Sequence, residues 1–411
     1  MRLNLKAALR KDRLVYALAL LASAVFLLVG NRIAVGERQV FGASGQGVIL
    51  RARVLQIMTD EQSSYDISAQ GGNGNTLRSI TFRARLLEGE SKRQTVTAVQ
   101  EINDLYGQRE HAVAPGDTVL LDLLPEDTTA PENASDPATG QPPAAGASAY
   151  LFLSFTRTTP LLLLAGCYAF LVLFFARKKG FDTLLSMGIT ILAIFAVLLP
   201  AVLTGRNIYV WTVVICAFVI FTNLLLVQGL NAKSLTAAAG CLGGLFCPAL
   251  IAALMQKPMH LTGLMDEDAV MLTYLDPPIN VRATISCMFL IGCVGALMDI
   301  TMTIVSAVHE IHEKEPELPA RELMKSGNSI GKDVIGTMAN TLVLAFIGGS
   351  MSEILLLVNY SGRLTQVLNL ELVSVEILQS LASCFSVVLT IPLTSFLCTL
   401  LMQRRTKKTV A

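Results

Sequence analysis

Two apolar stretches decide the fold of this chain: GCVGALMDITMTIVSAVHEI, residues 292–311, and SGNSIGKDVIGTMANTLVLAFIGGS, residues 326–350. The first carries an aspartate, Asp299, deep inside its apolar run, and a short charged connection separates it from the second. A carboxylate at the centre of a bilayer costs at least about 2.5 kcal/mol, so such a residue is a functional candidate by default. The two stretches therefore predict consecutive membrane-spanning helices that share a polar site.

Polar and small residues fall on one face of each predicted helix. At about 100° per residue, Asp299 and Thr303 align on the first helix, and Asp333, Thr337 and Asn340 align on the second. From these five residues we predict a site for ion or proton coupling, because Asp299 can ionise and the neutral oxygens can coordinate a cation or hold water. Asp299 lies roughly 15 Å from the end of its helix at the charged connection, and Asn340 lies roughly 10 Å from the end of the next helix at that same connection. The two residues can therefore meet.

Glycines accompany these polar faces. Small residues let two helix backbones approach closely, and the glycines that we predict to serve helix packing are Gly292, Gly295, Gly336 and Gly348. The alternative is that the polar groups themselves only hold the helices together through hydrogen bonds, and the sequence leaves that alternative open. It applies most to Asp333, which lies near the predicted water interface.

Composition places the whole chain among membrane proteins. Of its 411 residues 53% are hydrophobic and 15% charged, against roughly 25% charged in soluble domains. A net charge of +1 without a basic stripe argues against nucleic-acid binding. The cysteines lie in apolar runs and the histidines form no metal-binding pair, so no cofactor is expected and no metal ligand is identified. No nucleotide-binding or hydrolase motif occurs, and we do not expect an enzyme.

Apolar runs long enough to cross a bilayer number eight. They are residues 14–30, 159–176, 181–203, 207–230, 234–256, 283–308, 334–358 and 378–402. Lys and Arg concentrate before the first run, after the second and fourth, between the sixth and seventh, and after the last. The positive-inside rule then predicts a multi-pass protein of the plasma membrane with both termini in the cytoplasm. Residues 1–30 are interpreted as a cytoplasmic tail and an uncleaved anchor helix, residues 159–402 as a seven-helix membrane domain, and residues 403–411 as a basic tail.

Residues 36–125 predict a small extracytoplasmic β domain after the first span. The runs GVILRARVLQI, LRSITFRARLLEG and RQTVTAVQEI are rich in β-branched residues, and polar or glycine-rich turns separate them. Five or six short strands of this kind suggest a barrel or sandwich of the OB or barrel-sandwich type. Residues 126–148 are rich in Pro, Ala and Gly, so we predict a disordered insertion or linker.

The chain resembles the YibE/F-like family of bacterial integral membrane proteins. The resemblance rests on ARKKGFDTLLSMGITILAIFAVLLPAVLTG and on the two stretches quoted at the outset. It covers nearly the whole chain apart from residues 126–148. It implies a polytopic membrane protein that is a permease by conjecture, and it implies no particular substrate.

Two functions of different classes therefore follow. The first is a transporter or permease, with the lipid bilayer and an ion or small molecule as partners. The second is a membrane scaffold or envelope-signal sensor whose β domain binds an envelope protein. An intramembrane aspartyl protease is poorly supported, because neither Asp299 nor Asp333 stands in a GxGD sequence. Asp299 discriminates between the first two, since transport needs an ionisable group and a scaffold does not.

Overall fold

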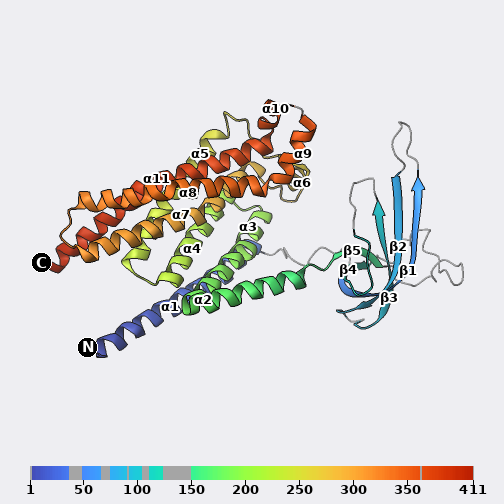
Figure 1. Cartoon of the computed structure of the whole chain (residues 1–411), viewed down its shortest axis with the longest axis horizontal. Coiled ribbons are helices and arrows are strands. Elements are labelled where there is room, and N and C mark those ends of the chain that lie inside the picture. The colour runs from blue at the N-terminus through green and yellow to red at the C-terminus, as the bar shows by residue number, and fades with distance from the viewer. Residues whose placement is uncertain are drawn as a thin grey trace. The chain divides into compact units, whose positions relative to one another are not determined.

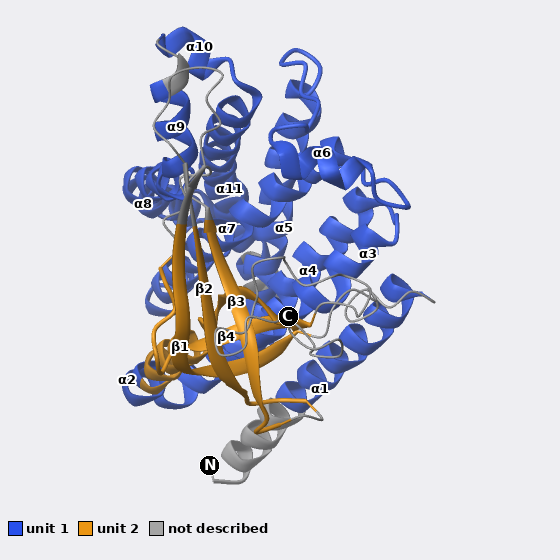
Figure 2. Ribbon diagram, turned by 90° about the vertical axis from the view of Figure 1, so that its right-hand side faces the viewer, with its two compact units in different colours: residues 1–42, 171–411 blue, residues 43–170 orange. Residues whose placement is uncertain are grey.

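The computed structural model describes residues 2–36, 49–65, 75–89, 92–103, 111–123, 150–361 and 363–410. These form two compact units, one of residues 43–170 and one of residues 1–42 with 171–411 (Figure 2). The insertion predicted at residues 126–148 lies outside the described residues.

The unit of residues 43–170 contains a closed five-stranded barrel. Its strands are β1 (Leu50–Tyr65), β2 (Asn75–Leu86), β3 (Thr95–Asn103), β4 (Thr118–Leu123) and β5 (Tyr150–Phe155). They follow the order β1-β2-β3-β5-β4, with β3 and β5 parallel and every other pair antiparallel. This is the strand order of an OB-type barrel, so the prediction of a small β barrel is confirmed.

Alternating residues of the strands fill the barrel. Ile80, Phe82, Ala84 and Leu86 of β2 all point inward and are fully buried, as the two-residue period of a strand requires. Two register shifts in β1, between residues 54 and 56 and between residues 57 and 59, are the kind of irregularity that bends a strand around a barrel.

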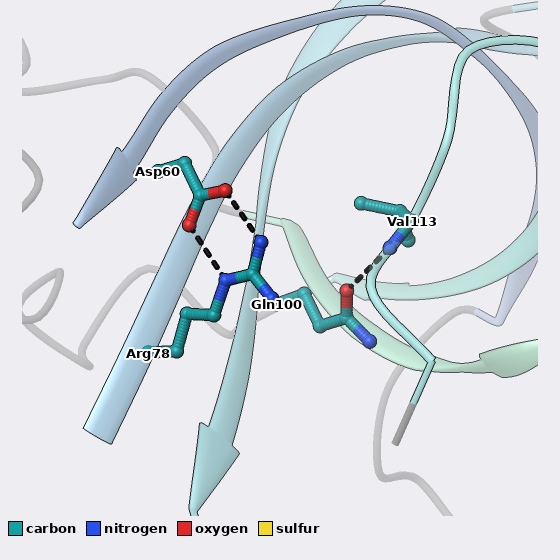
Figure 3. A network of polar contacts seen from close by, with 4 residues as sticks. All are labelled: Asp60, Arg78, Gln100 and Val113. Carbon is teal, nitrogen blue, oxygen red and sulfur yellow. Dashed lines mark hydrogen bonds and ion pairs between the residues drawn. The ribbon is translucent and has the colours of Figure 1, made fainter. Parts of the chain in front are cut away.

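Polar contacts fasten the barrel in two places (Figure 3). The fully buried Gln100 accepts a hydrogen bond from Val113 N at 2.9 Å and donates one to His111 O at 3.0 Å, which holds the segment before β4 against β3. Arg78 of β2 makes a two-pronged ion pair with Asp60 of β1, at 2.7 and 2.6 Å. The guanidinium lowers the pKa of Asp60, but the pair is solvent-exposed and therefore contributes little to the stability of the barrel.

The closing strand β5 corrects the predicted domain boundary. The sequence alone indicates that residues 149–160 lead the chain back to the membrane. In the structure, however, Tyr150–Phe155 pairs with both β3 and β4. The β domain therefore continues past residue 125, and residues 124–149 join two paired strands. Leu123 and Tyr150 are direct register partners, so a connection of only a few residues would suffice there.

Deleting residues 131–147 is accordingly expected to leave the thermal stability of the protein unchanged or slightly higher. The remaining residues still span the gap between Leu123 and Tyr150, and halving a loop lowers its closure cost by only about 0.6 kcal/mol. Thermal unfolding of the deletion protein beside the full chain measures this. A large fall in melting temperature would show that the segment packs against the barrel.

The unit of residues 1–42 and 171–411 is helical. It contains α1 (Arg2–Val35), most of α2 (Thr158–Ala193), a π-helical turn (Ile194–Leu198), α3 (Leu199–Leu203), α4 (Ile208–Gln228), α5 (Ala232–Met255), α6 (Glu267–Thr273), α7 (Val281–Lys314), α8 (Ala320–Gly349), α9 (Met351–Ser361), α10 (Leu364–Leu368) and α11 (Glu371–Val410). In Figure 1 α11 runs beside α8, and it also packs on α5 and α7. The main hydrophobic core lies mostly between α4, α5, α7 and α11.

Seven helical segments in the described residues are long and apolar enough to cross a membrane, against the eight expected. The difference arises at Thr158–Leu203, a 46-residue segment that contains both expected spans 159–176 and 181–203. Arg177 interrupts it with φ 48° and ψ −118°. A Cβ on Gly180 would lie 2.5 Å from Val172 O, whereas residues eight apart in a straight helix are about 12 Å apart. The segment therefore reverses sharply at Arg177.

Two other boundaries differ from the expected ones. The expected span 334–358 crosses the end of α8, which stops at Gly349 and begins as early as Ala320. The expected basic tail, residues 403–411, continues α11 as a helix to Val410. The first apolar run is shifted along the chain relative to α8, and the second is shorter than α11. Charged residues at a membrane surface can continue a helix beyond its apolar run.

Candidate functional site

The predicted coupling residues lie on the outer surface of the helical unit. Asp299 and Thr303 on α7, and Asp333, Thr337 and Asn340 on α8, are all exposed. The hydroxyl of Thr303 donates to Asp299 O at 2.8 Å, and that of Thr337 donates to Val334 O at 2.9 Å. Within the described part of the chain no hydrogen bond joins the Asp299 carboxylate to the residues of α8. Each helix thus presents its polar face outward.

The predicted packing glycines behave in two ways. Gly292 lies close to α11, since a Cβ there would come within 2.7 Å of Gln379 Nε2. Among the described residues, no other part of the chain comes within 4 Å of such a Cβ on Gly295, Gly336 or Gly348. Of the four, only Gly292 therefore permits a close approach of two helices within the described part of one chain.

A polar stripe that we had not predicted lies in the core, on α11. Its members are at most 6% exposed and fall within about 40° of one line along the helix. We call this set the α11 stripe; it consists of Gln379, Ser383, Ser386, Thr390 and Thr394. The stripe extends over about 22 Å, which is most of the roughly 30 Å hydrocarbon thickness of a bilayer.

Glycines on α5 make room for the α11 stripe. A Cβ on Gly240 would lie 2.5 Å from Thr394 Oγ1, and one on Gly244 would overlap Thr390 Oγ1. The two glycines and the two threonines are each four residues apart, so they form matching rows on two antiparallel helices. The hydroxyls therefore fill the space that the missing side chains leave.

Ser386 compensates a break in the backbone of α5. Pro248 lies inside α5 and has no N–H, so it cannot bond to the carbonyl four residues earlier, Gly244 O. The Ser386 hydroxyl donates to that same Gly244 O at 2.8 Å. Such side-chain bonds allow proline within membrane helices.

Removing the Ser386 hydroxyl should therefore destabilise the protein in a proline-dependent way. Ser386→Ala is expected to cost about 1–3 kcal/mol, because it leaves Gly244 O buried and unpaired. In a Pro248→Ala background the new N–H can bond to Gly244 O, and the cost should fall by about 1 kcal/mol. Equilibrium unfolding in detergent measures the cycle.

Ser380→Ala is the matched control for this cycle. The Ser380 hydroxyl bonds within its own helix, to Glu376 O at 3.0 Å, a carbonyl that keeps its ordinary helical partner. Equal costs of Ser386→Ala in the two backgrounds would refute the compensation.

Several polar atoms of the α11 stripe lack partners. In the described residues, Gln379 Oε1, Ser383 Oγ and Thr394 Oγ1 have no hydrogen-bond partner, nor has Ser395 Oγ beside the stripe. Buried polar groups are nearly always hydrogen-bonded, and an exception commonly marks a bound water or ion. Among the described residues, three atoms on one line of α11 are thus buried without a hydrogen-bond partner.

A small cavity lies beyond the Thr394 end of the stripe. It has a volume of about 110 Å³ and is lined by Lys233, Thr236, His309, His312 and Met402, among others. Thr236 lies one helical turn from Gly240 on α5, and so connects the position of Thr394 with this cavity. His309 Nδ1 lies 3.2 Å from Glu313 Oε1. No group of His, Cys, Asp and Glu residues in the described ranges is arranged to hold a metal ion.

The sequence does contain the signal for the α11 stripe. QSLASCFSVVLTIPLTS, residues 379–395, repeats Ser and Thr at intervals of three and four. Our prediction followed the ionisable residues instead, because charge in an apolar run is the stronger single indication.

The described helices indicate the class of the protein and the comparisons indicate its family. Seven long apolar segments around a buried polar stripe indicate a multi-span membrane protein. The chain belongs to the YibE/F-like protein family, which matches residues 164–404. That match includes the whole α11 stripe and confirms the resemblance seen in the sequence. Comparison with curated proteins and with solved structures found no match.

Proposed function

We propose that this chain is a transport protein of the bacterial plasma membrane in which the α11 stripe carries protons or another small cation. The observation that supports this most is the row of unpartnered polar atoms at Gln379, Ser383 and Thr394 in the described core. A hydroxyl can both donate and accept, so water molecules bound along this row would form a continuous hydrogen-bonded chain. Each proton could then pass from one water molecule to the next along the hydrogen bonds.

A second candidate, a scaffold or sensor, is supported by the outward polar faces of α7 and α8. Among the candidate spans, α8 has the smallest buried share, and it exposes Asp333, Thr337 and Asn340. Asp299 is exposed on α7 in the same way. A carboxylate that faces lipid is unfavourable, so a protein partner that covers this surface would stabilise it.

Flux through reconstituted protein tests the first candidate. The full chain is placed in liposomes that contain a pH-sensitive dye, and a potassium gradient with valinomycin imposes a membrane potential. We expect proton entry well above that of protein-free liposomes, or uptake of Na⁺ when that ion is supplied as a radiolabel. An absence of flux for protons, Na⁺ and K⁺ would contradict transport.

Asp299→Asn shows in the same assay whether Asp299 takes part in transport. Asparagine keeps the shape and much of the hydrogen bonding of aspartate but cannot ionise. If Asp299 couples transport, flux stops although the protein still reaches the membrane. If Asp299 belongs to a partner surface, flux persists, and the variant loses only cross-linking to its partner in cells.

We further propose eight membrane crossings with both termini in the cytoplasm. The 46 residues of Thr158–Leu203 rise about 69 Å, twice the thickness of the hydrocarbon core. Their reversal at Arg177 lies beside Lys178 and Lys179, which the positive-inside rule places in the cytoplasm. The β barrel, a possible binding site for an envelope protein, would then be extracytoplasmic.

Cysteine labelling tests this topology. Cysteines introduced at Gly74 and at Lys408 should react with a membrane-impermeant reagent from opposite sides, Gly74→Cys from outside. The unsubstituted chain gives the background from the native cysteines. Reaction of both positions from one side would exclude the arrangement.

A further inference from the structure

An acidic cavity lies at the Gln379 end of the α11 stripe, at the far end of α7 and α8 from their connecting turn. Its volume is about 440 Å³, and three carboxylates line it, those of Asp266, Glu353 and Glu376. Among the described residues, no Lys, Arg or His lines it. In the described residues neither Glu353 nor Glu376 is part of an ion pair. Asp266 accepts a hydrogen bond from Ala269 N as the N-cap of α6. The two glutamates therefore leave negative charge in the cavity that no cation of the described lining balances.

A buried amide adds a neutral oxygen to these carboxylates. Gln379 also lines the cavity and is only 6% exposed. Its Nε2 donates to Met288 O at 3.4 Å, while its Oε1 has no partner among the described residues. An unpaired buried acceptor is unfavourable, and a hydrogen-bond donor in the cavity would satisfy it.

The rim of the cavity is held in place. Both Thr262 N and Gly263 N donate to Glu371 Oε1 at 2.6 Å, and the Thr262 hydroxyl donates to Glu371 Oε2 at 2.7 Å. These bonds tie the loop that carries Asp266 to the first turn of α11, about one and a half turns from Glu376. The carboxylates are therefore positioned by the fold rather than by a flexible loop.

An apolar compartment adjoins the acidic one. Its volume is about 160 Å³, and it shares Phe346, Glu353 and Glu376, among others, with the acidic cavity. Among the described residues, seven line only this compartment, six of them apolar: Val343, Ile347, Ile354, Val373, Ile377, Leu381 and the polar Ser380. A ligand that occupies both compartments must be charged at one end and apolar at the other.

The spacing of the acidic groups argues against a bare metal ion. No group of three or more His, Cys, Asp or Glu residues in the described part of the chain is close enough to hold a metal. A cavity of about 440 Å³ also greatly exceeds a single ion. An ammonium group is larger, donates up to three hydrogen bonds, and interacts favourably with an aromatic ring such as that of Phe346.

We propose that the joined cavities bind an amphipathic organic ammonium ion. The ammonium group lies between Glu353, Glu376 and the Gln379 amide oxygen, and the apolar part lies among the side chains of α8, α9 and α11. This inference deepens the proposed function by giving a substrate class. It rests on that function only for the passage of the ligand, not for its binding.

Calorimetric titration of the full chain in lipid nanodiscs tests the proposal. The probes are phenethylammonium, the neutral isostere 2-phenylethanol, methylammonium, and Ca²⁺. We expect phenethylammonium to bind at least about tenfold more tightly than each of the others, because only it satisfies both compartments. Equal binding of the alcohol, of methylammonium or of Ca²⁺ would overturn the ligand class.

Single substitutions locate the binding. Glu353→Gln and Glu376→Gln should each weaken phenethylammonium binding at least about tenfold, since a carboxylate partner of the ammonium group is lost. Glu267→Gln is the matched control, because Glu267 is exposed on the nearby α6 and does not line the cavity. Glu353 lies on the surface of α9, so its variant should fold even if the other does not.

Unchanged affinity in Glu353→Gln, or an equal loss in Glu267→Gln, would refute the site. Nanodiscs support binding but no measurable flux. A protein that binds the probe but fails the liposome assay therefore retains this site and lacks the transport function. A protein that shows flux but does not bind the probe has the transport function and lacks this site.

Discussion

Replacing Gly244 by valine is expected to destabilise the helical unit by about 3 kcal/mol or more, or to prevent its folding. A Cβ at this position would overlap Thr390 Oγ1 and would lie 3.2 Å from Leu297 Cδ2. Both neighbours are fully buried, so they cannot move aside without straining the core. The substitution also displaces Thr390 from the row of α5 glycines. It thereby separates α5 from α11, which are two of the four central helices.

Gly295→Val is the control for this prediction. Gly295 lies inside α7, as Gly244 lies inside α5, but in the described part of the chain no neighbouring helix or side chain comes within 4 Å of a Cβ there. Thermal unfolding in detergent should show a large loss for Gly244→Val and little change for Gly295→Val. If the two variants lose similar thermal stability, then either Gly295 packs against a second protein chain or α5 and α11 do not pack tightly at Gly244.

Removing the unpartnered hydroxyls should abolish flux while the protein remains stable. Thr394→Val keeps the shape of the side chain, and Thr394 Oγ1 makes no hydrogen bond among the described residues, so no internal bond is lost. The same holds for Ser383→Ala. If these hydroxyls hold the water chain, each substitution should lower the proton flux at least about tenfold, and the double variant should lower it further.

Thr303→Val is the matched control for the flux measurement. It removes a hydroxyl from α7 whose bond is to its own helix, outside the core. Normal flux in Thr303→Val with loss in Thr394→Val places the route on α11. The opposite result would return the route to the outward face of α7 and α8 that the sequence predicted.

Much of the fold could be predicted from the sequence because its signals are local. The length of each apolar run identified the long helices, and β-branched runs between polar turns identified four of the five barrel strands. Strand β5 was missed because Tyr150–Phe155 stands next to an apolar helix and is separated from β4 by 26 residues. Its pairing with β3 and β4 is a long-range contact with no local pattern.

The site was harder to predict for a physical reason. Periodicity shows which residues share a helix face, but not whether that face meets another helix. Gly240 and Gly244 pack against hydroxyls, whereas Gly295 and Gly336 face open space within the chain, and nothing in their spacing distinguishes the two cases. Asp299 drew attention because charge in an apolar run is costly, while the neutral Ser and Thr residues of α11 are individually unremarkable.

Ordered water along α11 is the most direct test of the central claim. A density map of the full chain in lipid nanodiscs, at a resolution that shows water, should contain non-protein density within about 3 Å of Ser383 Oγ, Thr394 Oγ1 and Gln379 Oε1. Such density would establish the row of unpartnered groups as a hydrated path through the core. A dry row, with both hydroxyls rotated to donate to main-chain carbonyls of their own helix, would contradict it.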